Sequence, residues 1–550
     1  MDARKYLIII KGNDQTDSVS SFQFHDGKCE IVYTSAPNKI YSYQHSNVEI
    51  LSLQKEIDPA RVIVTANGQT ISEIDALLDF GEYYRIVRKG KKDLLAHRSD
   101  VQFQQNCLAN GKNQEIFQYF KETAAAVSLV TEEGKNILQL QYDKIKQVSD
   151  DTALASYLAP QEEAKDPQMP ETVIYPFGLN QSQKLAVERA LSSKISIIQG
   201  PPGTGKTQTI LNIIANIVQS GKTVAVVSSN NDATRNVVEK LEKKNAAFLT
   251  AFLGKYENKQ EFLKAQTGTY PDMSEWELPP EERRRLEQET TALSKELDEM
   301  LNAKNRIAEI EQEFLQLNPE QHYFKEYYAT CSDASTENLE RLSSQKILAL
   351  WVEFEQHAEH DSRLRLLQKL SIMFRFNRNA LKLFCRSPEL VIPYLQSQFY
   401  SARRRELEYE KWDLNYRLEH YAFDEKMDEL TQKSLRLFRA ELAARYVWKS
   451  DRTRFKMDDF YQKSELFTRE YPVVLSTTYK IKDSLHQGFI YDYLIVDESS
   501  QADLATGVLA FSCARNIVIV GDLKQLPNVL TEDDIRTSDA IWQKYSLDER

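Results

Sequence analysis

The sequence predicts an α/β protein built on a parallel β-sheet, with a long helical insertion between two of its strands and a β-rich region before it. Five short apolar runs each end in a polar or glycine-containing loop, which is typical of strands buried on both faces. Between the second and third runs, more than 200 residues contain no strand signal. The five predicted strands are Ile195–Ile198, Val224–Val227, Val473–Leu475, Tyr493–Val496 and Ile517–Val520.

Residues 1–110 are predicted to form a β-rich accessory domain, because short β-branched or aromatic runs there are separated by Gly, Asn and Asp. Residues 111–172 are predicted to be a helical segment that ends in a linker containing Pro160, Pro167 and Pro170. The predicted strands of the accessory domain are Tyr6–Ile10, Ser21–Phe24, Glu30–Tyr33, Val48–Leu51, Val62–Val64 and Tyr83–Val87.

Residues 173–255 and 465–550 are predicted to be the two parts of the parallel-sheet domain, separated by a helical insertion at 256–464. Two stretches of the insertion repeat an apolar residue every seven positions, which favours two long helices packed antiparallel as a coiled-coil arm. A helical bundle lying against the core is the open alternative. The repeating residues are Leu286, Leu293, Met300, Ile307 and Phe314, then Tyr400, Leu407, Leu414 and Tyr421.

Composition narrows the class of protein. Of the 550 residues, 41% are hydrophobic and 27% charged, and no apolar run reaches the ~18 residues of a membrane helix, so we expect no membrane partner. The five cysteines form no CxxC pair, which favours a cytoplasmic protein without a zinc site or disulfide framework. The net charge of −11 argues against broad coating of nucleic acid but allows a locally basic channel.

One glycine-rich loop predicts a site for ATP and Mg²⁺. It satisfies the pattern G-x-x-x-x-G-K-[ST] and lies between an apolar strand and an apolar helix. A chance match to the pattern would lack these neighbouring elements. Glycine lets the backbone wrap around phosphates, and the helix N-terminus adds N–H donors. Lys206 would reach the β- and γ-phosphates, and the Thr207 hydroxyl would hold Mg²⁺. The expected cofactor-binding residues here are Gly200, Pro201, Pro202, Gly203, Thr204, Gly205, Lys206, Thr207 and Gln208.

A carboxylate pair follows the fourth predicted strand. Asp497 is placed to bind Mg²⁺ and Glu498 to polarise an attacking water, which suits hydrolysis better than kinase chemistry. A solvated acidic turn is the alternative, and the phosphate loop argues against it. Lys206, Asp497 and Glu498 therefore form the predicted catalytic set, with Thr207 and Asp497 as metal ligands.

A series of motifs in a fixed order makes the sequence resemble superfamily-one helicases of the eukaryotic RNA-surveillance and DNA-replication type, and their long bacterial relatives. The resemblance implies a RecA-like P-loop NTPase fold and a protein that uses ATP to move along nucleic acid. The motifs are Leu179–Gln183, Gly200–Thr207, Ser228–Ala233, Ser476–Thr478, Asp497–Gln501 and Gly521–Pro527.

The resemblance also implies roles for individual residues. Gln183 would read the edge of adenine. Gln501 and Gln525 would join the catalytic set, and the motif of Gln525 would couple the γ-phosphate to grip on a strand. Single-stranded DNA or RNA would be the partner. The implied strand-contacting residues are Ser229, Asn230, Asn231, Ser476, Thr477 and Thr478.

The sequence departs from the family pattern in three places. Ser499 stands where the family usually has Ala, and Asn528 stands where a second Pro is common. The family's second RecA-like lobe, which supplies an aromatic residue and arginines to the nucleotide, does not occur before Arg550. We expect a truncated or split reading frame or a deliberate fragment, a separate chain carrying that lobe as a candidate partner, and weak or no hydrolysis by this chain alone.

A basic stretch lies inside the predicted insertion. Residues 363–386 contain no acidic residue, and Phe374, Phe376 and Phe384 are interleaved with the basic ones. This mixture is a nucleic-acid signature, and an amphipathic helix at the tip of an arm looks the same, so both interpretations stay open. The basic residues are Arg363, Arg365, Lys369, Arg375, Arg378, Lys382 and Arg386.

The predicted function is that of an ATP-dependent nucleic-acid helicase or translocase, represented by its first motor domain. The rival is a nucleotide-dependent switch or scaffold, in which ATP changes partner binding and no strand is unwound. Stimulation of ATP hydrolysis by a nucleic-acid strand would separate the two.

Overall fold

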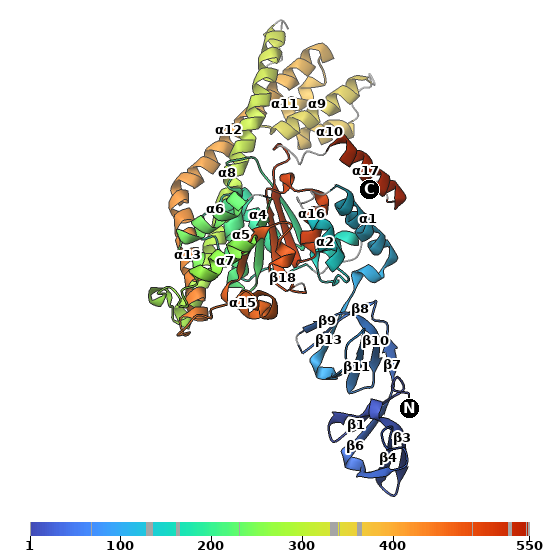
Figure 1. Ribbon diagram of the computed structural model, residues 1–550. Helices are drawn as coiled ribbons and strands as arrows, with labels where there is room; N and C mark the ends of the chain where they lie inside the picture. Colours follow the sequence, from blue (N-terminus) through green and yellow to red (C-terminus); the bar gives the residue numbers. More distant parts are fainter. Residues whose placement is uncertain are drawn as a thin grey trace. The chain divides into compact units, whose positions relative to one another are not determined.

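The computed structural model divides the chain into two compact units (Figure 1). The first comprises Met1–Val173, Leu185–Glu277 and Arg439–Arg550, and the second comprises Ile174–Lys184 and Leu278–Phe438. The described residues are 2–67, 69–127, 136–160, 166–229, 231–329, 339, 341–359, 366–486, 488–525, 531–545 and 547. Of the residues named above, Asn230, Arg363, Arg365, Asn528, Arg550 and the end of the segment Gly521–Pro527 lie outside them.

The first unit is centred on a six-stranded parallel sheet in the order β14-β19-β18-β15-β17-β16. Its five longest strands contain the five predicted ones, which confirms the α/β fold class with its RecA-like parallel sheet. In the register, Val224 lies opposite Val473 on one side and Tyr493 on the other. The strands are β14 (Ile195–Gln199), β15 (Val224–Ser228), β16 (Thr250–Phe252), β17 (Val473–Thr477), β18 (Tyr491–Asp497) and β19 (Ala514–Gly521).

The strand β16 corrects the prediction that no strand lies between the second and third predicted ones. It is only three residues long and pairs with β17, with Thr250 opposite Val473. A run of three residues is too short to carry a periodic signal, so only its pairing partner identifies it as a strand.

Helices pack on the sheet because its strands are apolar. The helix α5 (Lys206–Gln219) buries ten consecutive residues, Thr209–Val218. A second apolar cluster joins the strands to α16 (Leu504–Phe511) and to the helices α1 (Gly111–Val127), α2 (Ile137–Lys144) and α3 (Ala153–Leu158). Residues of the predicted helical segment therefore fill part of the sheet domain's core. Further helices of this unit are α6 (Asn231–Glu242), α7 (Tyr256–Ala265), α14 (Asp459–Gln462), α15 (Ser464–Glu470) and α17 (Glu532–Lys544).

The N-terminal region forms small antiparallel sheets, as its alternating short runs predict. Their orders are β2-β1-β6, β3-β4-β5, β12-β11-β10-β7 and β13-β8-β9. One apolar cluster joins β1 to β10, which links the first and third of these sheets. The strands are β1 (Tyr6–Ile10), β2 (Asn13–Asp14), β3 (Val19–His25), β4 (Lys28–Tyr33), β5 (Ile40–Gln44), β6 (Val48–Ser52), β7 (Lys55–Ile57), β8 (Val62–Ala66), β9 (Gln69–Ile71), β10 (Ile74–Asp79), β11 (Tyr83–Arg88), β12 (Leu94–His97) and β13 (Val101–Gln105).

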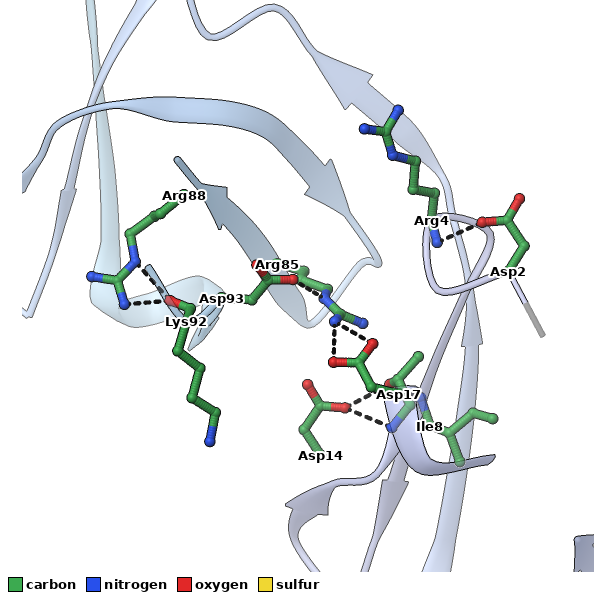
Figure 2. Close-up of polar contacts among 10 residues, drawn as sticks. Asp2, Arg4, Ile8, Asp14, Asp17, Arg85, Arg88, Lys92 and Asp93 are labelled. Carbon is green, nitrogen blue, oxygen red and sulfur yellow. Dashed lines mark hydrogen bonds and ion pairs between the residues drawn. The ribbon is translucent and has the colours of Figure 1, made fainter. Parts of the chain in front are cut away.

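A buried arginine connects one of these sheets to the turn that precedes β3 (Figure 2). Arg85 of β11 donates from Nη2 to both carboxylate oxygens of Asp17 at 2.7 and 2.8 Å, and from Nε to Asp93 at 2.9 Å. The Arg85 side chain is 4% exposed, whereas Asp17 lies largely in solvent. Burial opposes the guanidinium charge, but the bonds to Asp17 and Asp93 outweigh it and raise the pKa of Arg85.

The second unit is helical, and its two longest helices, α8 and α12, pack antiparallel. Arg306 of α8 pairs with Glu410 of α12 at 2.7 Å, and Glu313, about two turns further along α8, pairs with Arg403. The numbering therefore runs in opposite directions along the two helices. The helices are α8 (Pro280–Ala329), α9 (Ser344–Glu359), α10 (Leu366–Arg375), α11 (Arg378–Leu383) and α12 (Pro388–Tyr421), and both α4 (Gln181–Ser192) and α13 (Phe423–Tyr446) span the two units.

The seven-residue repeat describes this packing only in part. Leu286, Leu293 and Leu407 are buried as predicted, but Leu297 and Ile310, which lie off the predicted repeat, are the most buried apolar residues of α8. The helices α9, α10 and α11 share a further apolar cluster with the start of α12. A supercoiled arm stays a prediction.

Within the described residues, no helix is both long and apolar enough to cross a membrane.

Candidate active site

The carboxyl ends of the strands bring most of the predicted motifs to one edge of the sheet. Gln199 of β14 lies opposite Gly521 of β19, and the Gly200 N–H donates to the Gly521 carbonyl at 3.1 Å. In the middle of the sheet, Ser228 lies opposite Asp497 on one side and Thr477 on the other. This is the edge at which open parallel sheets bind ligands.

The phosphate loop enters α5 through two glycines with positive φ, Gly203 at 85° and Gly205 at 82°. Gly205 is the N-cap of α5, in a left-handed conformation that a residue with a Cβ adopts only at a cost. The Lys206 ammonium folds back and donates to the Gly200 carbonyl at 2.6 Å, while Thr204 Oγ1 donates to the Pro201 carbonyl at 2.8 Å. The loop thus curls over the N-terminus of a 14-residue helix, where N–H groups and the helix dipole favour an anion.

The carboxylate pair ends β18 beside this loop. Asp497 is 7% exposed, and its Oδ1 accepts the Glu498 N–H at 2.9 Å. Burial raises the pKa of the Asp497 carboxyl above its usual value, the Glu498 charge adds to this, and Lys206 opposes it. The backbone of Glu498 adopts the left-handed conformation, at φ 51° and ψ 40°. Such a conformation costs a non-glycine residue about 1–3 kcal/mol and gathers at functional sites.

The end of β19 packs against the turn that follows the carboxylate pair. A Cβ added at Gly521 would collide with Ser499 Oγ, so a larger residue at this position would force the Ser499 hydroxyl to move. The next residue, Asp522, is buried, and its Oδ1 accepts the Lys524 N–H at 2.9 Å. The Gln525 N–H donates to the Asp522 carbonyl at 3.2 Å.

The remaining predicted catalytic residue, Gln501, lies in the short turn after Glu498. Its N–H donates to the Glu498 carbonyl at 3.0 Å, and its side chain is exposed. The turn (Ser499–Gln501) therefore holds Gln501 at the surface close to the carboxylate pair.

The oxygen donors at this edge fit a magnesium ion. Among the described residues, Asp497 Oδ2 accepts no hydrogen bond, and the half-buried Thr207 hydroxyl in the first turn of α5 makes none. Mg²⁺ prefers one or two protein oxygens and completes its shell with water and phosphate. Thr207 and Asp497 are the residues that would hold it.

The Asp497→Asn substitution should stabilise the nucleotide-free protein at neutral pH. The pKa of Asp497 is higher in the folded protein than in the unfolded chain. The free energy of unfolding therefore falls as the pH rises from the lower of these pKa values through the higher one and the buried carboxylate becomes charged. Thermal unfolding at several pH values measures this. We expect a higher Tm for Asp497→Asn at pH 7 and a smaller difference from the parent at acidic pH. An unchanged or lower Tm at pH 7 would contradict it.

Gln183 belongs to the second unit and caps α4. Its Oε1 accepts the Asn180 N–H at 2.9 Å, and Asn180 Oδ1 accepts the Gln183 N–H at 2.9 Å. This reciprocal pair is the capping-box arrangement, and the spacing of an Asn and a Gln three residues apart could have predicted it. The role in reading adenine stays a prediction.

The predicted strand-contacting residues fall into two groups. Ser229 is exposed at the end of β15, and Asn231 begins α6. Ser476, Thr477 and Thr478 are buried, and the Thr477 and Thr478 hydroxyls have no hydrogen-bond partner within the described residues. These hydroxyls would need to be uncovered before they could touch a strand.

Sequence reasoning missed the residues that anchor the loop after β17. Lys259 of α7 is buried, and its Nζ donates to the carbonyls of Asp483 at 2.9 Å and Ser484 at 3.3 Å and to the Tyr461 hydroxyl at 3.0 Å. Lys144 of α2 pairs with the Asp483 carboxylate at 2.9 Å. The partners are far apart in the sequence, so no local pattern predicts them.

A phosphate loop, a buried aspartate and an adjacent glutamate at the carboxyl edge of a parallel sheet define a P-loop ATPase. A family model described as an AAA domain matches residues 178–532, which is more than half of the chain. The chain belongs to this family, and its motifs and relatives place it among the superfamily-one helicases.

Three relatives illustrate the likeness. DNA-binding protein SMUBP-2 of Rattus norvegicus is 44% identical over 75 residues, 14% of this chain and 8% of that protein. The regulator of nonsense transcripts 1 homolog of Drosophila melanogaster is 46% identical over 68 residues, 12% and 6% respectively. The uncharacterized ATP-dependent helicase MJ0104 of Methanocaldococcus jannaschii is 47% identical over 72 residues, 13% and 11%. The matched segments thus span at most about a tenth of these relatives' length.

Proposed function

We propose that this chain is the first motor domain of an ATP-dependent nucleic-acid translocase. One observation carries the proposal: the register of the central strands puts Asp497 beside Ser228, and Ser228 beside Thr477. A change in the bound nucleotide that shifts Asp497 would therefore also shift the polar loops after β15 and β17, because these strands are directly paired. The names of relatives, which include DNA-binding protein and ATP-dependent helicase, support nucleic acid as the partner.

Each residue of the site has a proposed task. Lys206 and the N-terminus of α5 bind the phosphates, and Thr207 and Asp497 hold Mg²⁺, which supplies neutralisation of charge on the phosphate oxygens. Glu498 orients the attacking water and accepts its proton. A second RecA-like lobe, on whichever chain carries it, is proposed to complete the nucleotide site with an aromatic residue and arginines.

The decisive experiment measures ATP hydrolysis with and without short oligo(dT), oligo(U) and duplex DNA. Stimulation by single strands, with binding that weakens as salt is raised, is expected of a translocase. The rival function is a nucleotide-dependent switch. Nucleotide-dependent partner binding without any stimulation by a strand would favour the switch and exclude the translocase.

The Lys206→Ala substitution should weaken binding of Mg·ATP or Mg·ADP by about 10–100-fold. The loss of the ammonium group is expected to cost about as much as one charge-assisted hydrogen bond to phosphate, about 1.5–3 kcal/mol. Titration calorimetry of both proteins measures the change. Lys222→Ala is the matched control, because Lys222 precedes β15 at the opposite end of the strand and should leave affinity unchanged. Equal affinity of Lys206→Ala and parent would refute the phosphate site.

A further inference from the structure

Asp483 lies in the turn after β17 and is held through both its main chain and its side chain. Its carbonyl accepts from Lys259 Nζ at 2.9 Å and from the Tyr461 hydroxyl at 3.3 Å. Its carboxylate accepts from Lys144 Nζ at 2.9 Å and from Gln141 Nε2. The donors to the carbonyl come from α7 and α14, and the donors to the carboxylate come from α2, so three helices meet at this one residue.

The turn that carries Asp483 is bonded to the predicted strand-contacting motif. The Asp483 N–H donates to the Lys480 carbonyl at 3.0 Å, and the Lys480 N–H donates to the Thr477 carbonyl at 3.0 Å. Ser484 Oγ donates to Ser476 Oγ at 3.2 Å. The position of Asp483 therefore helps to fix the backbone of the polar motif that precedes it.

The helix α2, which supports the Asp483 carboxylate, is itself fixed to the sheet domain. Tyr142 of α2 is fully buried, and its hydroxyl donates at 2.6 Å to the carbonyl of Ala505 in α16, which lies beside α2 (Figure 1). Gln141 is also buried, so its bond to the carboxylate is charge-assisted and shielded from water. The pair between Lys144 and Asp483 lies partly in solvent and contributes less.

The bonds that hold the turn leave two hydroxyls without partners. Thr477 and Thr478 are 3% and 1% exposed, and neither hydroxyl makes a hydrogen bond within the described residues. The side chains that hold the turn bind its far end, at Asp483 and Ser484. A buried hydroxyl without a partner is unfavourable, so this conformation gains stability when a ligand uncovers the hydroxyls and supplies the missing bonds.

We propose that Asp483 is a positioning residue for strand binding, held by α2 so that the polar motif after β17 meets a single strand in one conformation. The inference rests on the proposed translocase function, because it assigns a task at the predicted strand-contacting site. A turn that is fixed before binding loses less conformational freedom when the strand arrives, which favours tighter binding. The helical segment before the sheet domain thereby supports strand binding as well as the core of the sheet.

The test uses Asp483→Ala, which removes the carboxylate but keeps the carbonyl that Lys259 binds. Fluorescence anisotropy with labelled oligo(dT) and oligo(U) measures strand affinity on the full chain, and titration calorimetry measures affinity for Mg·ADP. We expect strand affinity to fall about five- to tenfold with unchanged nucleotide affinity. A residue that serves folding alone would change neither affinity of the folded protein. Asp539→Ala, at an exposed carboxylate of α17, is the matched control and should leave both affinities unchanged.

Exchange of the two charges provides a rescue. Lys144→Asp alone should weaken strand binding, and its combination with Asp483→Lys should restore part of the affinity, because the ion pair is rebuilt with its signs reversed. Gln141 Oε1, which has no partner within the described residues, can then accept from the introduced lysine. Both substituted side chains are partly exposed, so folding is expected, and circular dichroism with thermal unfolding checks it.

Strand affinity of Asp483→Ala equal to that of the parent would overturn the positioning role and leave the proposed function standing. Tighter binding would overturn it too, since the contacts of Asp483 would then restrain the turn against the strand. Equal loss of strand and nucleotide affinity would show a general structural role and exclude positioning. A parent chain that binds no single strand even at low salt would refute the proposed function, and this inference with it.

Discussion

Replacing Glu498 with glutamine is expected to lower ATP turnover by about 10²–10⁴-fold, which is the range that a positioned general base contributes. The amide keeps the shape of the side chain but cannot accept the proton of the attacking water. Nucleotide binding should persist, because Lys206 and α5 are untouched. Phosphate release measured under strand-stimulated conditions, beside binding of a fluorescent ATP analogue, separates the two effects.

The matched control for this experiment is Glu532→Gln, which removes a carboxylate from the exposed start of α17. It should leave turnover within about twofold of the parent, since surface changes of this kind have small effects. Turnover of Glu498→Gln equal to that of the parent would show that another group activates the water. Loss of nucleotide binding in Glu498→Gln would show that Glu498 holds the loop in place instead.

Removing both carboxylates around Arg85 should destabilise the N-terminal sheets more than removing Arg85 itself. The double substitution Asp17→Asn and Asp93→Asn removes both carboxylates that bind a buried guanidinium and leaves the charge of Asp14 near it, which costs up to about 3–5 kcal/mol. Arg85→Met removes the buried charge as well, and replacement of a buried ion pair by apolar groups is often close to neutral. Arg85→Met loses all three hydrogen bonds that Arg85 makes (Figure 2). It is nevertheless expected to be destabilised less than the double variant.

Hydrogen exchange at the amides of β11 is the suitable measurement, because residues 1–110 contain no tryptophan to report unfolding by fluorescence. The double variant should show faster exchange there than Arg85→Met, with unchanged exchange in the parallel sheet. Asp26→Asn, on an exposed turn, is the control for loss of one carboxylate. Faster exchange in Arg85→Met than in the double variant would mean that the pair itself stabilises the fold.

The parallel sheet could be predicted because each long strand is apolar on both faces and ends in a recognisable loop. The phosphate loop and the carboxylate pair could be predicted for a related reason. Phosphate binding requires glycines, a lysine and a helix start in consecutive positions, so a short stretch of sequence is enough to predict it. The strand β16 carries no such signal, since three residues define neither a period nor a loop.

Other features depend on contacts between distant parts of the chain and could not be predicted. Lys259 lies more than 200 residues from Asp483, and Arg85 lies far from Asp17 in sequence. Nothing near Lys259 distinguishes it from the many lysines on helix surfaces. Its burial and its carbonyl partners exist only in the folded molecule.

The helical insertion lies between these cases. A repeat of seven predicted long helices correctly, but it did not predict which residues would be most buried. An α-helix has 3.6 residues per turn, so a strict seven-residue stripe drifts around a straight helix. Leu297 and Ile310 lie on opposite sides of this stripe, so their burial shows that α8 meets neighbours over a wider face than the repeat marks.

The order of strands in the sheet has a consequence for synthesis of the protein. Within the described residues, β14 pairs with β19 alone, and Ile195 meets Ile517 more than 300 residues further along the chain. At about 5–20 residues per second, a ribosome takes roughly 15–60 s to produce the partner strand. The helices of the second unit, whose partners are nearer in sequence, can fold during this delay. The strand that leads into the phosphate loop is therefore among the first parts of the sheet to be made and among the last to be paired.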